Sequence, residues 1–470
     1  MVDQLSGLPK VKDYVTQKLF LGNEPNAELI AILTVYFVQG ILGLSRLAVS
    51  FFLKDELLLS PVQVSTLVGI VFLPWMIKPV FGFISDGLPI FGYRRRPYLI
   101  LSGILGTASW VSLATIVHTS WAATLAIALG SLSVAMSDVI VDSLVVERAR
   151  DESQAKAGSL QSLCWGASAI GGLITAYFSG LLLQYFTTRT VFEITALFPL
   201  IVSGVAWLIA ESPVSQDAQD SNQTNLPIKH QLGQLRQAIS QKTIWLPTAF
   251  IFIWQATPNA DSAFFYFTTN ELHFEPEFLG RVHLVTSFAS LAGVLIFQRF
   301  LKSIPFRVIF TWSTVLSSIL GMTMLLLVTH TNRLLGIDDH WFSLGDSLIL
   351  TVMGKIAFMQ VMVLTARLCP SGVEATLFAL LMSIYNSAGS VSHAFGALIT
   401  YWLGITATNF ESLWLLVVIT NLSTLLPLPF INWLPATDEQ TETSKAGEQG
   451  FLPDLMSELV LREPESEIME

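Results

Sequence analysis

Long continuous runs of apolar residues fill most of this sequence and constrain its fold more than any other feature. A helix needs about 20 mostly apolar residues to cross the hydrocarbon core of a bilayer. The runs are continuous, which excludes the short alternating strands of a membrane barrel. The sequence therefore predicts an all-α integral membrane protein with twelve transmembrane helices, near residues 28–51, 62–84, 97–117, 121–146, 157–183, 191–210, 244–269, 278–300, 307–329, 346–367, 373–402 and 410–434.

The composition agrees with membrane integration. Apolar residues make up 52% of the 470 residues and charged residues only 13%, whereas soluble domains carry about 25% charged residues. The net charge of -10 comes mostly from the end of the chain, residues 436–470, which we interpret as a solvated tail. Two distant cysteines and scattered histidines give no metal-ligand spacing, and no catalytic arrangement is visible. We expect no enzyme activity, no metal or cofactor, and no nucleic-acid partner.

The positive charges predict the orientation. If both termini are cytoplasmic, eighteen of the 25 lysines and arginines fall in cytoplasmic segments, four in outer loops and three inside helices. This excess is the positive-inside pattern of membrane proteins. The first 27 residues lack the features of a secretory or organelle-targeting peptide. We expect a multi-pass monomer in the cell inner (plasma) membrane, with a plastid envelope left open.

A polar stretch divides the apolar runs into two sets of six. Residues 211–243 are rich in Ser, Gln, Asn and Asp and predict a cytoplasmic linker. They separate an N-terminal six-helix half (28–210) from a C-terminal six-helix half (244–435), with a cytoplasmic segment (1–27) before them and the acidic tail (436–470) after them. Two halves built from three-helix repeats are typical of transporters that work by alternating access. This division favours a transporter over a receptor or a channel.

Six charged residues lie inside the predicted helices. A charge in the bilayer interior costs at least about 3 kcal/mol, so each one indicates a functional role. If the two halves form a major facilitator fold, helices 1, 4, 7 and 10 line the central cavity, and five of the six charges lie on those helices. The six residues are Arg46, Lys78, Asp138, Asp142, Asp261 and Lys355.

Two of these charges form a candidate proton site. Asp138 and Asp142 are four residues apart and share one helix face. Two nearby carboxylates do not easily both ionise at low dielectric, so one of them is suited to carry a proton. The alternative is that each pairs with a helix cation, such as Lys78 or Lys355, and only holds the bundle together. Lys78 lies between two prolines, which loosen the helix there. For both Lys78 and Arg46 the sequence leaves two alternatives: the side chain contacts an anion, or it extends toward the lipid headgroups.

Polar residues also gather where Pro258 interrupts the seventh apolar run. Helices that are broken at mid-membrane often form the binding sites of transporters. Thr257, Asn259 and Asp261 can bind the polar edge of a flat ring, and neighbouring aromatic residues can stack on that ring. The alternative is that these polar groups only pack against other helices.

The segment between the second and third helices resembles the signature of the major facilitator superfamily. That signature has Gly, three residues and Asp, followed by Gly and basic residues. Here Gly82 and Asp86 fit the first part, but Gly92 comes two positions later than usual. An Asp at a helix end beside a basic turn can latch the cytoplasmic ends of two halves, and the alternative is an ordinary charged loop. The candidate gating residues are Asp86, Gly92, Arg95, Arg96 and Arg148.

Longer strings resemble the folate-biopterin transporter family, in its cyanobacterial and plastid branch. They include LSRLAVSFFLKDE (44–56), LPWMIKP (73–79), GSLQS (158–162) and WQATP (254–258), and the similarity spans roughly residues 28–435. The resemblance implies a major facilitator that takes up folates and related pterins by alternating access. It also implies symport, with protons as the expected coupling ion.

The resemblance completes a set of candidate substrate-binding residues. A folate carries a flat pterin with a hydrogen-bonding edge and a glutamyl tail with two carboxylates. Carboxylate side chains can accept from the pterin edge and cations can hold the tail, but the sequence does not say which residue binds which end. The candidates are Arg46, Lys78, Asp138, Asp142, Gln161, Thr257, Asn259, Asp261 and Lys355. A carrier of another polar solute (a sugar, a nucleoside or S-adenosylmethionine) and a non-transporting ligand sensor are the alternatives.

Overall fold

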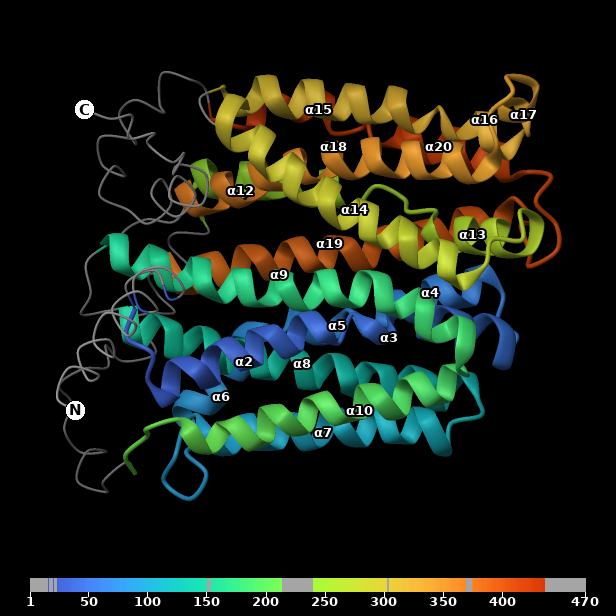
Figure 1. Ribbon diagram of the computed structural model, residues 1–470. Helices are drawn as coiled ribbons and strands as arrows, with labels where there is room; N and C mark the ends of the chain where they lie inside the picture. The colour runs from blue at the N-terminus through green and yellow to red at the C-terminus, as the bar shows by residue number, and fades with distance from the viewer. Residues whose placement is uncertain are drawn as a thin grey trace, which may run out of the picture.

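The structure, a computed structural model of the chain, is a bundle of helices aligned along one long axis (Figure 1). It describes residues 16, 20, 23–149, 154–213, 240–301, 304–368 and 374–435. Within these ranges no strand is present apart from a single bridge between Ile90 and Tyr93, so the prediction of an all-α protein is confirmed. The predicted acidic tail and most of the predicted N-terminal segment and linker lie outside the described residues.

Six helical segments form the N-terminal half. They are α2 (Ala27–Ile41) with α3 (Leu44–Phe51) and the π-helix η2 (Phe52–Glu56); α4 (Pro61–Val71) with α5 (Leu73–Met76) and α6 (Lys78–Gly87); α7 (Arg96–Thr115); α8 (Ser120–Ala149); α9 (Gln154–Tyr185); and α10 (Thr188–Val205) with the short η3 (Ala206–Leu208).

Six further segments form the C-terminal half, with the short α17 (Thr331–Leu334) in a loop between two of them. They are α12 (Lys242–Gln255) with α13 (Asp261–Tyr266) and the π-helix η5 (Phe267–Glu271); α14 (Pro276–Ile296) with η6 (Phe297–Leu301); α15 (Phe306–Gly321) with α16 (Met324–Val328); α18 (Asp339–Arg367); α19 (Glu374–Trp402); and α20 (Leu413–Ser423) with η7 (Leu428–Trp433).

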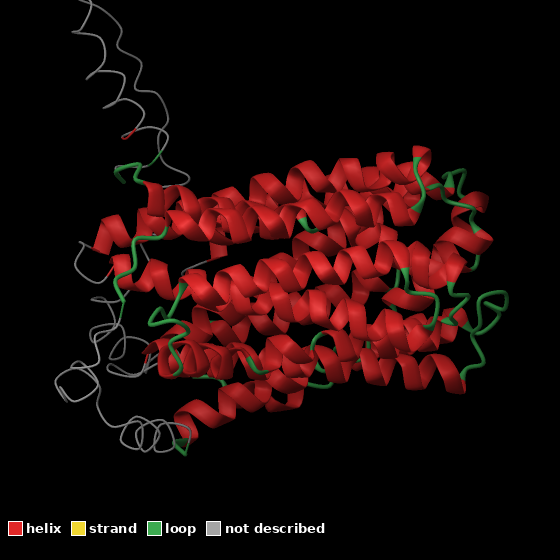
Figure 2. Cartoon of the chain, turned by 90° about the horizontal axis from the view of Figure 1, so that it is seen from below, coloured by secondary structure: helices red, strands yellow, loops and turns green. Residues whose placement is uncertain are grey.

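Ten of these segments are long and apolar enough to cross a membrane by length and composition, within the ranges described. The remaining two are the broken segment α12–α13–η5 and α19, and both run along the bundle beside the others (Figure 1). Together they make the predicted twelve. The view from below shows the same common axis (Figure 2). We call the end where α2 starts and η7 finishes the terminal end, and the opposite end the distal end.

The two halves meet through a small number of helix pairs. α4 packs against α19 and α13, and α9 packs against α14. Near the distal end, α9 and α14 touch through their backbones, because a Cβ added to Gly180 would lie 2.7 Å from the Gly280 Cα. Small residues allow helices in a membrane to approach this closely, so the sequence permits close contact between the halves here.

The second and seventh segments are interrupted beside prolines, as the sequence predicts. The second is interrupted at Phe72 and at Ile77, so that Lys78 begins a new helix. The seventh is not helical over residues 256–260, around Pro258. Proline removes a backbone donor and its ring clashes with the preceding turn. Both interruptions therefore leave polar backbone and side-chain groups near the middle of the bundle.

The first and seventh segments end in the same way, which reveals an internal repeat. η2 and η5 are five-residue π-helices with the sequences FLKDE and FTTNE. In each, the amide after the π-helix donates to the carbonyl of the first Phe. A residue with positive φ follows two positions beyond each π-helix, Leu58 at 51° and His273 at 55°. The two segments thus occupy equivalent positions in two related halves.

These two π-helical ends meet at the distal end. The Lys54 ammonium lies 2.6 Å from the Asp55 carboxylate and donates over 2.8 Å to the side-chain oxygen of Asn270. The Tyr266 hydroxyl donates to the Leu59 carbonyl. The rings of Phe51 and Phe265 pack edge to face, with centroids 5.2 Å apart. We call the contacts that join the first two segments to the seventh, together with the adjacent Lys54–Asp55 pair, the distal closure.

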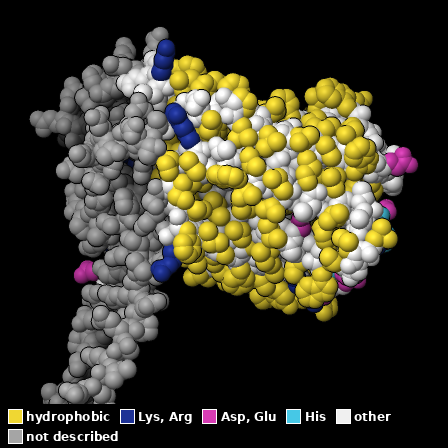
Figure 3. Space-filling view, turned by 90° about the horizontal axis from the view of Figure 1, so that it is seen from above, with side chains coloured by type: hydrophobic (Ala, Val, Ile, Leu, Met, Phe, Trp, Pro, Cys, Tyr) yellow, Lys and Arg dark blue, Asp and Glu magenta, His cyan; other side chains and the backbone are white. Residues whose placement is uncertain are grey.

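The surface of the bundle is suited to lipid. Apolar side chains cover the middle of the face in Figure 3, Lys and Arg side chains lie next to the terminal end, and acidic and histidine side chains lie at the distal end. Large rings such as those of Phe288 and Trp312 are exposed on the outside of the helices. An apolar surface of this extent would promote aggregation in water, whereas a bilayer accommodates it.

Candidate functional site

Lys78 and Asp138 form an ion pair inside the N-terminal half. The Lys78 ammonium at the start of α6 contacts the Asp138 carboxylate on α8. It also lies 5.1 Å from the centroid of the Trp75 ring, and a ring face stabilises a partly desolvated cation. The Lys78 and Asp138 side chains are 22% and 14% exposed, so the protein does not completely enclose the pair. The structure therefore brings together two of the predicted substrate-binding residues.

Asp142 lies one turn further along α8 and has a different partner. The Tyr36 hydroxyl on α2 donates to Asp142 Oδ1. Tyr36 is 3% exposed, so this hydrogen bond is buried between the first and fourth segments. Lys78, Asp138, Asp142 and Tyr36 form what we call the carboxylate cluster.

The carboxylate cluster has an odd number of charges. With both carboxylates ionised it carries two negative charges against one ammonium, and a single bound proton makes it neutral. A net charge inside a bundle at this depth is costly, and closely spaced carboxylates share protons as a pair. The cluster is therefore chemically able to bind and release one proton.

The polar residues around Pro258 line a separate cavity in the C-terminal half. Asn259 donates from its side chain to Asp261 Oδ2 over 2.8 Å, and Asp261 is exposed. The Ser392 hydroxyl on α19 donates to the Thr257 carbonyl over 2.5 Å. The cavity has a volume of about 250 Å³ and is lined by residues of α12, α15, α18 and α19 and of the break itself, including Trp254, Thr257, Asn259, Thr314, Gly354 and Ser392. Three predicted candidates therefore gather at the break, away from the carboxylate cluster.

Among the residues that the structure describes, Lys355 and Arg46 differ from Lys78 in having no acidic partner. Lys355 Nζ on α18 lies 4.8 Å from the centroid of the Phe358 ring. Arg46 on α3 is exposed and close enough to His283 on α14 for their charges to interact. Within the described residues, no Asp or Glu carboxylate lies within 4.0 Å of either cation. Of the three predicted cations, Lys78 therefore pairs with a carboxylate, whereas Lys355 and Arg46 have no carboxylate partner among the described residues.

The predicted gating residues make their described contacts within the N-terminal half. The Arg95 guanidinium donates to Glu147 at the end of α8 over 2.6 Å and to Ser85 over 2.9 Å. The Arg96 guanidinium donates to the Ile209 carbonyl after η3 over 2.6 Å. The Arg148 side chain donates to Asn26 before α2 over 2.8 Å. These contacts tie the helix ends of one half together, and a latch between the two halves stays a prediction.

Three further predicted residues need separate mention. Gly92 adopts a φ of 83° in the turn between Ile90 and Tyr93, a conformation that glycine adopts without strain. The side chains of Asp86 and Gln161 lie outside the described part of the structure. Their predicted roles therefore stay predictions.

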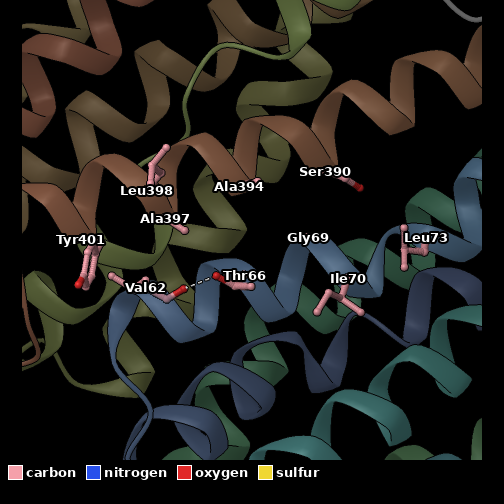
Figure 4. Close-up of a pocket in the computed structure, with 10 residues that line it drawn as sticks. All are labelled: Val62, Thr66, Gly69, Ile70, Leu73, Ser390, Ala394, Ala397, Leu398 and Tyr401. Carbon is pink, nitrogen blue, oxygen red and sulfur yellow. Dashed lines mark hydrogen bonds between the residues drawn. The ribbon is translucent and has the colours of Figure 1, made fainter.

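A second cavity, larger than the one at the helix break, is lined by none of these charged residues. It has a volume of about 400 Å³ and lies between α4 and α19, as the close-up shows (Figure 4). Its lining is almost wholly apolar, with Gly69, Ala394 and Ala397 between longer side chains such as Leu73 and Tyr401. Those longer side chains are exposed at the surface. We interpret this groove as a lipid-facing seam between the halves rather than a site for a polar solute.

Sequence reasoning missed several residues that the structure places near these sites. Tyr36 occurs in the middle of an apolar run, and nothing in its neighbourhood marks it as a carboxylate partner. The side-chain oxygen of Thr314 is buried and has no hydrogen-bond partner among the described residues. Thr314 lines the cavity at the helix break. Buried polar atoms are normally satisfied, so such atoms are a signal that only coordinates reveal.

A bundle of two related six-helix halves, with charged groups held inside the membrane-spanning region, defines a membrane transport protein of the major facilitator fold. A mutant of the nucleoside transporter NupG shares this fold, with a TM-score of 0.66, 12% identity, and coverage of 87% of this chain and 100% of that chain. At that identity the likeness concerns the fold alone. The predicted fold class is confirmed.

The chain belongs to the BT1 family, whose sequence profile matches residues 39–450. It is 62% identical to the folate-biopterin transporter of Synechocystis over 432 residues, which is 92% of this chain and 86% of that protein. It is 30% identical to folate transporter 2 of Plasmodium falciparum over 421 residues, covering 88% of this chain and 91% of that protein. The predicted membership of the folate-biopterin transporter family is confirmed.

Proposed function

We propose that this protein takes up folates and related pterins across the cell inner (plasma) membrane by alternating access, coupled to protons. The substrate class rests on the relatives, because a protein that is 62% identical over 92% of this chain is named a folate-biopterin transporter. The coupling rests on the carboxylate cluster, which is the observation that carries the mechanism. In this proposal the protein works as a monomer, since one chain supplies both halves.

The proposed coupling ion follows from the charge of the cluster. Asp138 and Asp142 share one ammonium, Lys78, and one hydroxyl, Tyr36. A proton that binds when the site faces the outside neutralises the cluster and lowers the energy of moving it through the closed state. Release on the other side restores the negative charge. This sequence links one proton to each transport cycle.

The proposed orientation puts the terminal end in the cytoplasm. The lysines and arginines beside the terminal end in Figure 3 support it. With that orientation the distal closure, in which Lys54 binds Asn270 and Phe51 packs on Phe265, faces the outside. The structure then represents a state that is closed to the outside, one of the two that alternating access requires.

The decisive experiment is uptake by purified protein in liposomes. We expect labelled folate to accumulate under an inward proton gradient, and to equilibrate without accumulation when a protonophore collapses the gradient. Empty vesicles give the background. Folate uptake no greater than in empty vesicles under the gradient contradicts the proposed function.

Two further arms separate the alternatives. Unlabelled biopterin competes with folate under this proposal, whereas competition only by a sugar, a nucleoside or S-adenosylmethionine reassigns the substrate. Exchange of external labelled folate against internal unlabelled folate distinguishes a transporter from a sensor, because a sensor binds ligand without moving it.

A further inference from the structure

Lys355 belongs to the C-terminal half, and its ammonium has no carboxylate partner among the described residues. It is half-buried near the middle of α18. Within the part of the chain that is described, no carboxylate of either half is within ion-pair distance of its Nζ. A lone ammonium inside a membrane bundle is unfavourable and indicates a function. Lys78, by contrast, has its carboxylate partner in place.

The backbone of α18 holds Lys355 in a fixed position. α14 packs on α18 so closely that a Cβ added to Gly293 would lie 2.9 Å from the Cβ of Lys355. The stem of Lys355 therefore packs against α14. Its ammonium lies 4.8 Å from the centroid of the Phe358 ring, one turn further along α18.

A line of contacts leads from Lys355 to the interface between the halves. The Phe358 ring lies 5.9 Å from the ring of Tyr385 on α19. The next residue of α19, Asn386, donates from its side chain over 3.5 Å to the carbonyl of Trp75. The ring of Trp75 lies under the ammonium of Lys78. The two lysines thus lie on opposite sides of the contact between α5 and α19, one in each half.

The charges on the two sides differ in kind. The N-terminal side holds two carboxylates, one ammonium and the Tyr36 hydroxyl, and carboxylates accept hydrogen bonds from ring N–H groups. The C-terminal side presents an ammonium that has no carboxylate partner among the described residues. An anion that reaches Lys355 forms a charge-assisted hydrogen bond without breaking an existing ion pair, whereas an anion at Lys78 must compete with Asp138.

We propose that Lys355 binds the carboxylate-bearing tail of the substrate and so determines the preference for folates over pterins that lack a tail. This inference rests on the proposed function and assigns the two ends of the substrate to the two halves. The pterin ring is bound on the side of the carboxylate cluster, and the glutamyl tail is bound on the side of α18.

The test compares two substrates in one variant. Folate has a glutamyl tail with two carboxylates, and biopterin has none. In Lys355→Gln, we expect the KM for folate to rise about tenfold or more, the loss expected when a hydrogen bond to a charged group is removed. We expect the KM for biopterin to change less than about twofold. Uptake into liposomes with matched protein content gives both constants.

Three variants control the test. Lys355→Arg keeps the charge and is expected to retain a preference for folate. Lys355→Met keeps an unbranched side chain of similar length beside Gly293 without the charge, and serves as the second neutral variant if Lys355→Gln does not insert. Arg281→Gln removes a positive charge from the exposed distal end of α14, where the one ion pair of Arg281 among the described residues is with Glu277, and is expected to change neither KM.

Failure of this inference can be distinguished experimentally from failure of the proposed function. If wild-type protein transports neither folate nor biopterin, the proposed function fails. If wild-type protein transports both but the neutral Lys355 variants keep the folate KM of wild type, the proposed function stands and this inference is overturned. Equal loss of folate and biopterin uptake in both neutral variants also overturns it, because it indicates a structural role.

Discussion

Asp142 and its hydroxyl partner offer the sharpest test at the scale of single residues. Asp142→Asn keeps the size of the side chain but removes the negative charge, which imitates a cluster that permanently holds its proton. We expect accumulation of folate against its gradient to be lost, while exchange of labelled against unlabelled folate continues at a rate within about tenfold of wild type. Liposome assays with and without a proton gradient measure both.

A matched control for that prediction is Glu277→Gln, which removes a carboxylate at the distal end that contacts Arg281. It is expected to accumulate folate normally. Undiminished accumulation in Asp142→Asn would remove Asp142 from the coupling mechanism.

The predicted site residues were only partly brought together, and the reason is local. The four-residue spacing places Asp138 and Asp142 on one helix face. The structure brings Lys78 to the same cluster, because the second segment, which is interrupted by prolines, faces α8. Asp261 begins α13 in the other half, where Asn259, two residues before it, donates to its carboxylate and accepts from its backbone amide. Such local side-chain to backbone bonds compete with longer-range pairing, and a sequence does not reveal which contact forms.

At the scale of helices, we expect the broken seventh segment to depend on one glycine of α19. A Cβ added to Gly396 would lie 1.8 Å from the carbonyl oxygen of Asn259, which is backbone and unable to move aside without shifting the break. Gly396→Ala is expected to destabilise the protein by about 1–3 kcal/mol, as overpacking does, and to lower folate uptake. Thermal unfolding in detergent and liposome uptake measure the two effects.

Gly389 on the same helix provides the matched control. The nearest atom to a Cβ at Gly389 is Gln255 Nε2 at 3.7 Å, an ordinary contact. Gly389→Ala also gains helix propensity, so we expect its melting temperature to equal or exceed that of wild type. If the two alanine variants melt at the same temperature, the close approach at Gly396 does not hold the break in place.

The elements themselves were largely predictable because a bilayer leaves a chain few choices. A segment that crosses it must satisfy its backbone internally, so length and apolarity suffice to indicate a helix. The start of α18 was missed because polar residues there, Asp339 and His340, depress the hydropathy of its first turn. The repeat of η2 and η5 was missed because only a Phe, a Glu and a Leu recur at equivalent positions.

At the scale of the whole molecule, the arrangement of the two halves could not be predicted beyond their number. The twelve apolar runs and the polar linker indicate two halves, but they do not say which faces meet. That depends on close contacts such as Gly180 with Gly280 and on the groove of small residues between α4 and α19. Residues of this kind occur throughout membrane helices, so the sequence gives no means of selecting the ones at the interface.

The distal closure yields a prediction for the molecule as a whole. Lys54 joins Asp55 and Asn270, the latter from the other half, so Lys54→Gln weakens a bond that holds the two halves together at this end. The contact that crosses between the halves is the hydrogen bond from the Lys54 ammonium to Asn270. Replacing this charged donor with the neutral amide of Gln is expected to cost roughly 1 kcal/mol, which corresponds to a severalfold shift between closed and open states. We expect the closed state to lose population by about two- to fivefold.

Ser50→Cys reports on that shift, because Ser50 lies one helical turn from Lys54 on the same face. In a background that carries Cys164→Ser and Cys369→Ser, a membrane-impermeant thiol reagent outside intact cells is expected to label it about two to five times faster when Lys54→Gln is present. Arg281→Gln, at the same end of the bundle, is expected to leave the labelling rate unchanged.

An unchanged labelling rate with Lys54→Gln would mean that the π-helical ends do not control access from this end of the bundle. Labelling that occurs only after the cells are made permeable would place the distal end in the cytoplasm and reverse the proposed orientation.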